Sequence, residues 1–186
     1  MSAQDMMVHP VDPDEKWLYR VGGFSAIVFV IAYLLIIAFY VPVGKPSGAE
    51  AWLTSMAENT TTWWAILGLS VLTDFLLVPV AFSLYQALKG IDKYKMQVAI
   101  AFVGFFVILD LALTWTNYAA LIALSGNYAS AKTDAQRAVF VTAAMYPASV
   151  VDSNLLFVYN SLTLAVGILF TSLVMVKGIF NKGTAY

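Results

Sequence analysis

Residues 72–95 read LTDFLLVPVAFSLYQALKGIDKYK, and residues 107–115 read VILDLALTW. Two long apolar runs are thus joined by a short charged link, and each run carries one acid, Asp74 or Asp110. Asp92 in the link lies midway between them in the sequence. If both runs are helices that rise about 1.5 Å per residue, the two carboxyls lie at similar depth. The sequence therefore predicts a helical hairpin with an acid in each arm.

The composition is that of an integral membrane protein. Of the 186 residues, 61% are hydrophobic and 11% are charged, whereas about a quarter of a soluble domain is charged. The charges lie between long apolar runs, as in a chain that crosses a bilayer several times. The net charge of -1 gives no basic surface for nucleic acid. The chain has no Cys and a single histidine, His9, so we expect no thiol chemistry, no metal and no cofactor.

Four segments are long and apolar enough to cross a bilayer, which predicts an all-α, integral membrane four-helix bundle. An acidic tail, residues 1–16, precedes them, and the spans cover residues 17–43, 62–88, 94–124 and 153–179. Seven Lys and Arg lie in the tail, the charged link and the C-terminus, against three in the other two connections. The positive-inside rule then predicts a multi-pass protein of the cell membrane with both termini in the cytoplasm.

Each of the two longer connections predicts a short amphipathic helix on the outer membrane surface. The first, about residues 48–58, starts with a capping box at Ser47-Gly-Ala-Glu50. The second starts with another capping box at Thr133-Asp-Ala-Gln136 and is expected to stop before Pro147. Its nine apolar residues are too few to cross the bilayer, so an interfacial or re-entrant helix is expected.

Three features predict local detail within the spans. Pro79 is expected to kink the second span and free a carbonyl near Phe75. Gly22 and Gly23 either permit close helix contact or loosen the first turn, and we favour the second alternative. The N-cap of the last span is Asp152 or Ser153.

The two acids predict a polar cluster at the centre of the bundle. An Asp at a helix centre costs about 2.5–3.5 kcal/mol on insertion scales. No Lys, Arg or His lies inside the apolar runs to neutralise it. At neutral pH we expect at least one carboxyl to be protonated, or the pair to share a proton or hold a cation. Helical spacing and depth give the candidate members Asp74, Asp110, Thr114, Asn117, Tyr118 and Asn160.

Three interpretations of this cluster stay open. It can consist of interhelical hydrogen bonds alone, each worth about 0.6 kcal/mol. It can be a proton or cation site. It can also be the polar end of a pocket for a lipid or small molecule, with Ser70, Trp64, Tyr85 and Trp115 as candidate pocket residues. Tryptophans near span ends are also typical of an interfacial belt.

Four blocks of the chain form a pattern that is similar to a known family. They are AEAWLTSMAEN, TDFLLVPVAFSLYQALKGIDK, LDLALTWTNYAALIALSGNYASA and DAQRAVFVTAA, all within residues 18–182. The pattern resembles a widespread prokaryotic family of small multi-pass membrane proteins of unknown function. The resemblance implies the membrane fold and brings no activity or site residue. Because longer members carry further spans, it also implies a short form or a partner that supplies packing surface.

We therefore predict a non-enzymatic accessory or structural subunit that packs against membrane lipids and against other membrane proteins or itself. One alternative is a proton- or cation-coupled transporter or channel component that uses Asp74 and Asp110. Another is a binder of a lipid, quinone or hydrophobic small molecule in an outward pocket between spans two to four. An enzyme is less favoured, because the sequence shows no nucleophile–base pair or metal triad.

Overall fold

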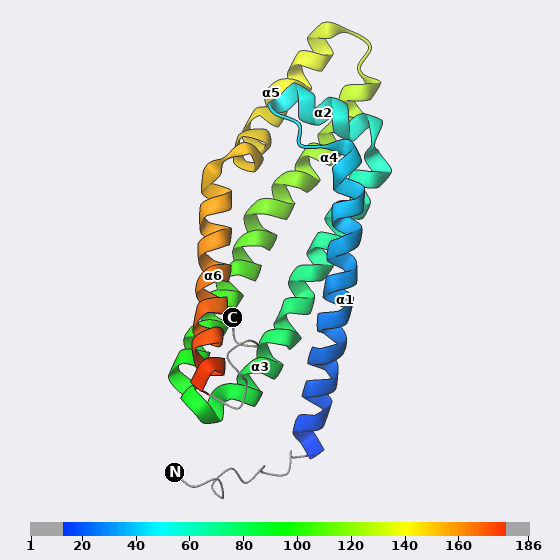
Figure 1. Ribbon diagram of the computed structural model, residues 1–186. Coiled ribbons are helices and arrows are strands. Elements are labelled where there is room, and N and C mark those ends of the chain that lie inside the picture. Colours follow the sequence, from blue (N-terminus) through cyan, green and yellow to red (C-terminus); the bar gives the residue numbers. More distant parts are fainter. Residues whose placement is uncertain (1–12, 178–186) are drawn as a thin grey trace, which may run out of the picture.

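The protein is all-helical over residues 13–177, which are the residues that the computed structural model describes (Figure 1). Most of the predicted tail and residues 178–179 of the last predicted span lie outside the described residues. The elements are α1 (Pro13–Val43), α2 (Ala49–Glu58), α3 (Thr60–Leu109), the π-helix η2 (Asp110–Trp115), α4 (Thr116–Ser130), α5 (Asp134–Asp152) and α6 (Asn154–Lys177). The all-α prediction is confirmed.

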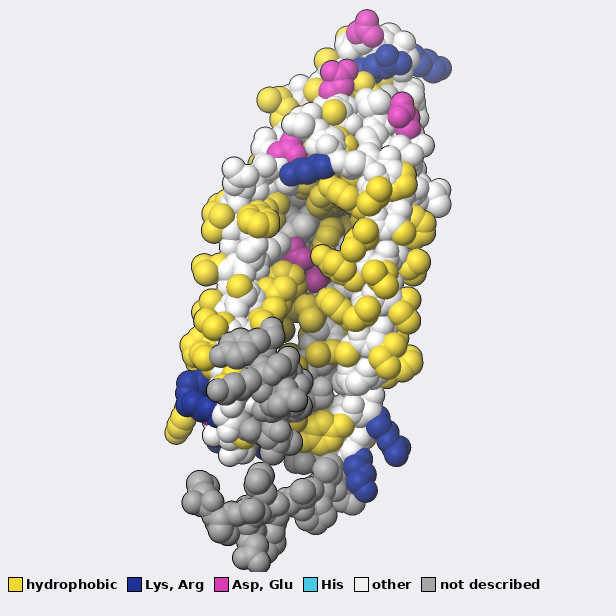
Figure 2. Space-filling model, in the orientation of Figure 1, with side chains coloured by type: hydrophobic (Ala, Val, Ile, Leu, Met, Phe, Trp, Pro, Cys, Tyr) yellow, Lys and Arg dark blue, Asp and Glu magenta, His cyan; other side chains and the backbone are white. Residues whose placement is uncertain are grey.

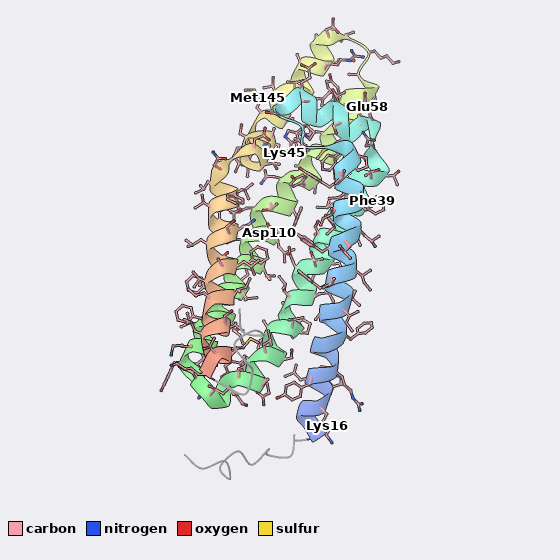
Figure 3. All side chains as sticks on the ribbon, viewed as in Figure 1. Lys16, Phe39, Lys45, Glu58, Asp110 and Met145 are labelled. Carbon is pink, nitrogen blue, oxygen red and sulfur yellow. The ribbon has the colours of Figure 1, made fainter. Side chains whose placement is uncertain are left out.

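Three continuous helical segments are long and apolar enough to cross a membrane: Lys16–Val43, Thr60–Ser130 and Asp134–Lys177. Figure 2 shows hydrophobic side chains along the sides of the molecule and Lys and Arg near its two ends. Lys16 and Lys45 mark the opposite ends of α1 (Figure 3). The composition and the shape are thus compatible with a multi-pass membrane protein.

The longest segment reverses its direction at Asp92. This residue has φ −154° and ψ 88°, which are not helical values, and the ribbon turns back there (Figure 1). Residues 60–91 form a first leg, and residues 93–130 form a second leg that continues through η2 and α4. The predicted link is thus helical except at Asp92. Pro79 lies inside α3, and Asp92 is the residue of this helix with non-helical dihedrals. The expected kink at Pro79 stays a prediction.

Glycines let α1 and α6 approach the two legs closely. A Cβ on Gly22 would lie 2.1 Å from Ser83 Oγ, so α1 packs directly on the first leg. A Cβ on Gly167 would lie 2.9 Å from Val103 Cγ2, so α6 packs on the second leg. A Cβ on Gly23 would meet nothing within 4 Å. Our preference for a loosened first turn is therefore wrong for Gly22, which serves close contact.

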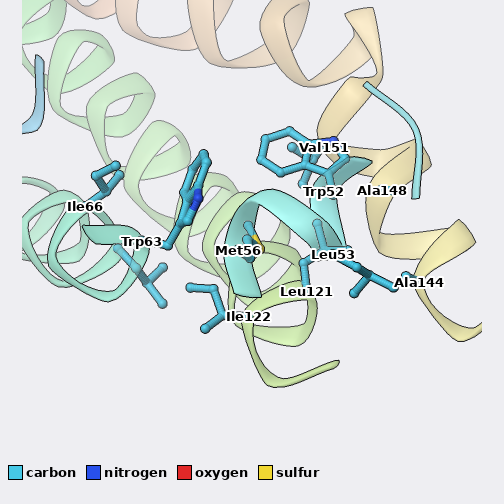
Figure 4. Packing of buried hydrophobic residues seen from close by; sticks show 11 residues of the cluster. Trp52, Leu53, Met56, Trp63, Ile66, Leu121, Ile122, Ala144, Ala148 and Val151 are labelled. Carbon is cyan, nitrogen blue, oxygen red and sulfur yellow. The ribbon is translucent and has the colours of Figure 1, made fainter. Parts of the chain in front are cut away.

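The helical cap consists of α2 with the parts of α3, α4 and α5 that pack on it (Figure 4). Trp52, Leu53 and Met56 of α2 are fully buried there. The whole cluster is Trp52, Leu53, Met56, Trp63, Ile66, Leu67, Leu121, Ile122, Ala144, Ala148 and Val151. The apolar face of the predicted surface helix is therefore covered by the protein itself.

The start of α2 is capped differently from the prediction. Its N-cap is Gly48, at φ 83°, and no side chain of the expected Ser47–Glu50 box bonds there. Instead Asp152 accepts hydrogen bonds from the Gly48 N–H at 3.0 Å and from the Trp52 indole N–H at 3.1 Å. A carboxylate at a helix N-terminus satisfies free N–H groups and complements the helix dipole. One acid from the end of α5 thus fixes the first turn of α2.

The second predicted surface helix is longer than expected. Its predicted N-cap is confirmed, since Thr133 Oγ1 accepts the Gln136 N–H at 3.2 Å. The Gln136 side chain accepts the Lys132 N–H at 2.9 Å, one residue before the N–H that a full capping box uses. However, α5 continues through Pro147 to Asp152, so the predicted stop before the proline is wrong. Pro147 is buried among residues that face α2 and α4, and this packing sustains the helix despite the missing N–H. Ser153 Oγ then accepts the Leu155 N–H at 3.1 Å, as expected of the N-cap of α6.

Asp92→Asn is expected to lower the thermal unfolding midpoint at neutral pH. Asp92 bonds both the backbone N–H and the ammonium of Lys95, and Lys177 Nζ of α6 lies 3.9 Å from its carboxyl. The bond from the Lys95 side chain is the main reason why the pKa of Asp92 is lowered. A lowered pKa means that the ionised carboxyl stabilises the fold above pH about 4 and that this stabilisation is lost at lower pH.

Midpoints of both proteins in detergent at several pH values test this. The difference between them should be present at pH 7 and shrink as the pH falls below about 4. Glu58→Gln, a change at an exposed acid, is the control and should show no such pattern. A difference that is the same at every pH would show that the ion pair does not stabilise the bend.

Candidate functional site

The acids of the two apolar runs line one lateral cavity between α1, α3, η2 and α6. The cavity has a volume of about 510 Å³, and Asp74 and Asp110 are only 3% and 5% exposed. In Figure 2 acidic side chains are visible inside a hollow halfway along the molecule, where Figure 3 labels Asp110. The structure thus brings the two predicted acids into one site that opens to the side.

Asp74 is held by a residue that the sequence did not pair with it. The Trp115 indole N–H donates to Asp74 Oδ2 at 2.7 Å and joins the first leg to the second. From the sequence, Trp115 is a candidate pocket residue or part of an interfacial belt of aromatic residues. It lines the cavity and is also a hydrogen-bond donor to its acid.

The π-helix η2 explains this arrangement. It starts at Asp110 and ends at Trp115, and its i→i+5 hydrogen bonds widen the turn. Residues five apart then come close to the same face, so Asp110, Thr114 and Trp115 all line the cavity. Short π-helical turns are frequent at functional sites. The local sequence DLALTW contains no Gly or Pro that would have indicated it.

Asn160 of α6 completes the polar cluster. Its Nδ2 donates to Asp110 Oδ1 at 2.8 Å and lies 3.4 Å from Thr114 Oγ1. Its Oδ1 is buried and has no hydrogen-bond partner among the described residues. With Asp110 ionised, the opposite amide orientation would place two acceptor oxygens against each other, so the amide N–H group faces the carboxylate. Asp110, Thr114 and Asn160 thus lie together, beside Asp74.

The other predicted site residues lie in different places. Ser70 is buried and lines the cavity. Asn117 bonds the Leu113 carbonyl at 2.6 Å instead of an acid, since its amide folds back on its own helix. Tyr118 packs in the helical cap beside Trp52, with ring centroids 5.4 Å apart. Trp64 is half exposed.

Tyr85 packs at the opposite end, against a small cluster near the bend. Aromatic residues of α1 line the cavity instead, and the sequence analysis missed them: Phe29, Tyr33 and Tyr40. Helix α1 is apolar on all sides, so no periodicity indicated which side faces the acids.

A second cavity of about 410 Å³ adjoins the first and extends toward the bend. Both cavities are lined by Phe29, Leu77 and Leu164, so they lie next to each other along the same side of the molecule. The second part is lined almost entirely by apolar side chains, such as Val103 and Ile168. We call this second cavity the apolar groove, and we call the first one, which contains Asp74 and Asp110, the carboxyl cavity.

The charged side chains and the purely apolar side chains lie in different parts of this region. Within the part of the chain that the structure describes, no Lys, Arg or His lines either cavity, although two acids line the first. Among residues 13–177, no group of three or more His, Cys, Asp or Glu side chains converges as a metal site would require. The arrangement can hold a hydrogen-bonding or positively charged group beside the acids and a hydrocarbon chain in the apolar groove.

No known protein family, curated protein or solved structure matches this chain. A functional proposal therefore rests on the residues of the cavity and the groove.

Proposed function

We propose that this protein crosses the membrane four times and binds an amphipathic molecule that enters sideways from the bilayer. The two legs on either side of Asp92 would each cross once, and α1 and α6 would supply the other crossings. Lys89, Lys93 and Lys95 at the bend favour a cytoplasmic position for it, with both termini on the same side. The helical cap would then lie at the outer surface.

One observation supports the binding function above all others: a cavity with two buried acids lies next to an apolar groove. Ligand sites are typically concave, mostly apolar and equipped with a few polar groups that fix orientation. Acids inside a membrane protein are costly and therefore point to function. The side opening suits a molecule that is already dissolved in the lipid phase.

A photoactivatable hexadecanol in liposomes tests this proposal on the full-length protein. Its chain carries the reactive group and its head is uncharged. Cross-links are expected on residues of the apolar groove on α3 and α6. Ala81 lines that groove, so Ala81→Phe should fill it and reduce labelling about tenfold, which corresponds to about 1.4 kcal/mol.

Ala101→Phe is the matched control, because Ala101 is exposed and lines neither cavity. It should leave the labelling unchanged. Cross-links spread evenly over all exposed helix faces, or equal labelling of both variants, would contradict a binding site.

A proton- or cation-coupled function is the second candidate, favoured by two acids in one cavity that no basic side chain lines. Asp74→Asn and Asp110→Asn should then abolish flux in proteoliposomes.

The accessory-subunit function stays a prediction, and the mass of the purified complex tests it.

A further inference from the structure

Building on the proposed binding function, we infer that the ligand is a single-chain amine whose ammonium group lies between Asp74 and Asp110. The inference concerns the head group, which the binding proposal leaves open. Three features of the carboxyl cavity determine it: the charge of its lining, the balance of donors and acceptors, and the aromatic side chains around it.

The first feature is charge. Both acids line the same cavity, and among residues 13–177 no Lys, Arg or His lines this cavity or the apolar groove. The acids have no ion pair among the described residues. An anionic head group, such as a fatty acid carboxylate or a lipid phosphate, would therefore be repelled in a site of low dielectric. A positively charged head group would balance the negative charge of the two carboxylates.

The second feature is hydrogen bonding. The protein donates to one oxygen of each acid, namely Asp74 Oδ2 from Trp115 and Asp110 Oδ1 from Asn160. The Asp110 carboxyl also interacts with the Thr114 hydroxyl and the Trp115 indole, whereas Trp115 is the one side-chain donor to Asp74 among the described residues. The buried Asn160 Oδ1 is a further acceptor without a partner among the described residues. Asp74 and Asn160 thus have acceptor oxygens that can take further donors, and an ammonium group carries three donors and no acceptor.

The third feature is the aromatic lining. Phe29, Tyr33, Tyr40, Phe106 and Trp115 surround the same cavity as the acids. Aromatic faces attract cations, and such rings recur in sites that recognise ammonium groups. Beyond them, the apolar groove offers room for a hydrocarbon chain. Because none of the described lining residues is basic and could bind a phosphate, we expect an amine without an adjacent phosphate group.

Three photoactivatable probes with the same chain and different heads test this inference: hexadecylamine, hexadecanol and palmitate. In liposomes at neutral pH, we expect groove labelling by the amine to exceed that by the alcohol about tenfold, a difference of about 1.4 kcal/mol. Palmitate should label least. Lysophosphatidylethanolamine, which carries a phosphate beside its ammonium, should not compete with the amine.

The double variant Asp74→Asn/Asp110→Asn should remove the advantage of the amine and keep the labelling by the alcohol. The head-group series on the unchanged protein stands by itself if this variant does not fold. Equal labelling by the amine and the alcohol, or competition by the lysophospholipid, would overturn the amine and leave the binding function intact. If no probe labels the groove, both proposals fail.

Discussion

Trp52→Ala is expected to lower the free energy of unfolding by about 3–5 kcal/mol, the range for removal of a buried large aromatic side chain. Trp52 is fully buried in the helical cap, where its ring lies 5.4 Å from those of both Trp63 and Tyr118. Its indole N–H also donates to Asp152, the acid that caps α2. The substitution would thus leave a cavity and remove one of the two bonds that hold this acid.

Heating in detergent followed by size-exclusion chromatography measures the effect as the temperature at which half of the folded peak is lost. Trp64→Ala is the matched control, since Trp64 is 50% exposed and should change the midpoint little. The midpoint of Trp52→Phe should lie between those of Trp52→Ala and Trp64→Ala, because phenylalanine keeps most of the packing and loses the hydrogen bond to Asp152. Similar midpoints for Trp52→Ala and Trp64→Ala would show that the cap does not stabilise the fold.

Gly22→Ala is expected to destabilise the protein by about 1–3 kcal/mol, the usual cost of overpacking a tight contact. The new methyl group would lie 2.1 Å from Ser83 Oγ, 2.5 Å from Ser83 Cβ and 3.1 Å from the Pro79 carbonyl oxygen. The helix backbone cannot move away locally, so α1 must shift from the first leg. Since α1 also forms one wall of the carboxyl cavity, the shift should weaken ligand binding as well.

Gly23→Ala is the matched control, because a Cβ there meets nothing within 4 Å and alanine favours a helix. The double variant Gly22→Ala/Ser83→Gly should recover much of the lost stability, since it removes both Ser83 atoms that clash. Equal unfolding midpoints for the two alanine variants, or no recovery in the double variant, would contradict close packing of α1 at this point.

Patterns of local sequence predicted the helices well and predicted their ends less well. The charged link around Asp92 indicated the reversal, because several charges close together between two long apolar runs are typical of a connection between membrane spans. The stop before Pro147 was wrong because the proline is buried in packing that local sequence does not show. Ser47 was expected to cap α2, and an acid one hundred residues away in the chain, Asp152, does so instead.

The candidate site was predictable only where one helix face contains it. Spacing on an ideal α-helix grouped Asp110 with Thr114 correctly, but it also included Asn117 and left Trp115 aside. The π-helical turn causes this error, because it changes the faces of all residues that follow it. Apolar helices such as α1 contain no periodic signal, so Tyr33 and Tyr40 could not be assigned to the cavity in advance.

The bond between Trp52 and Asp152 also orders events in time. At about 5–20 residues per second, the ribosome adds Asp152 roughly 5–20 s after Trp52. Throughout that interval the first turn of α2 lacks the acid that caps it and must wait for the end of α5. During biogenesis the cap can therefore close only after most of the chain has been synthesised, and a segment made early receives its last hydrogen bonds from one made late.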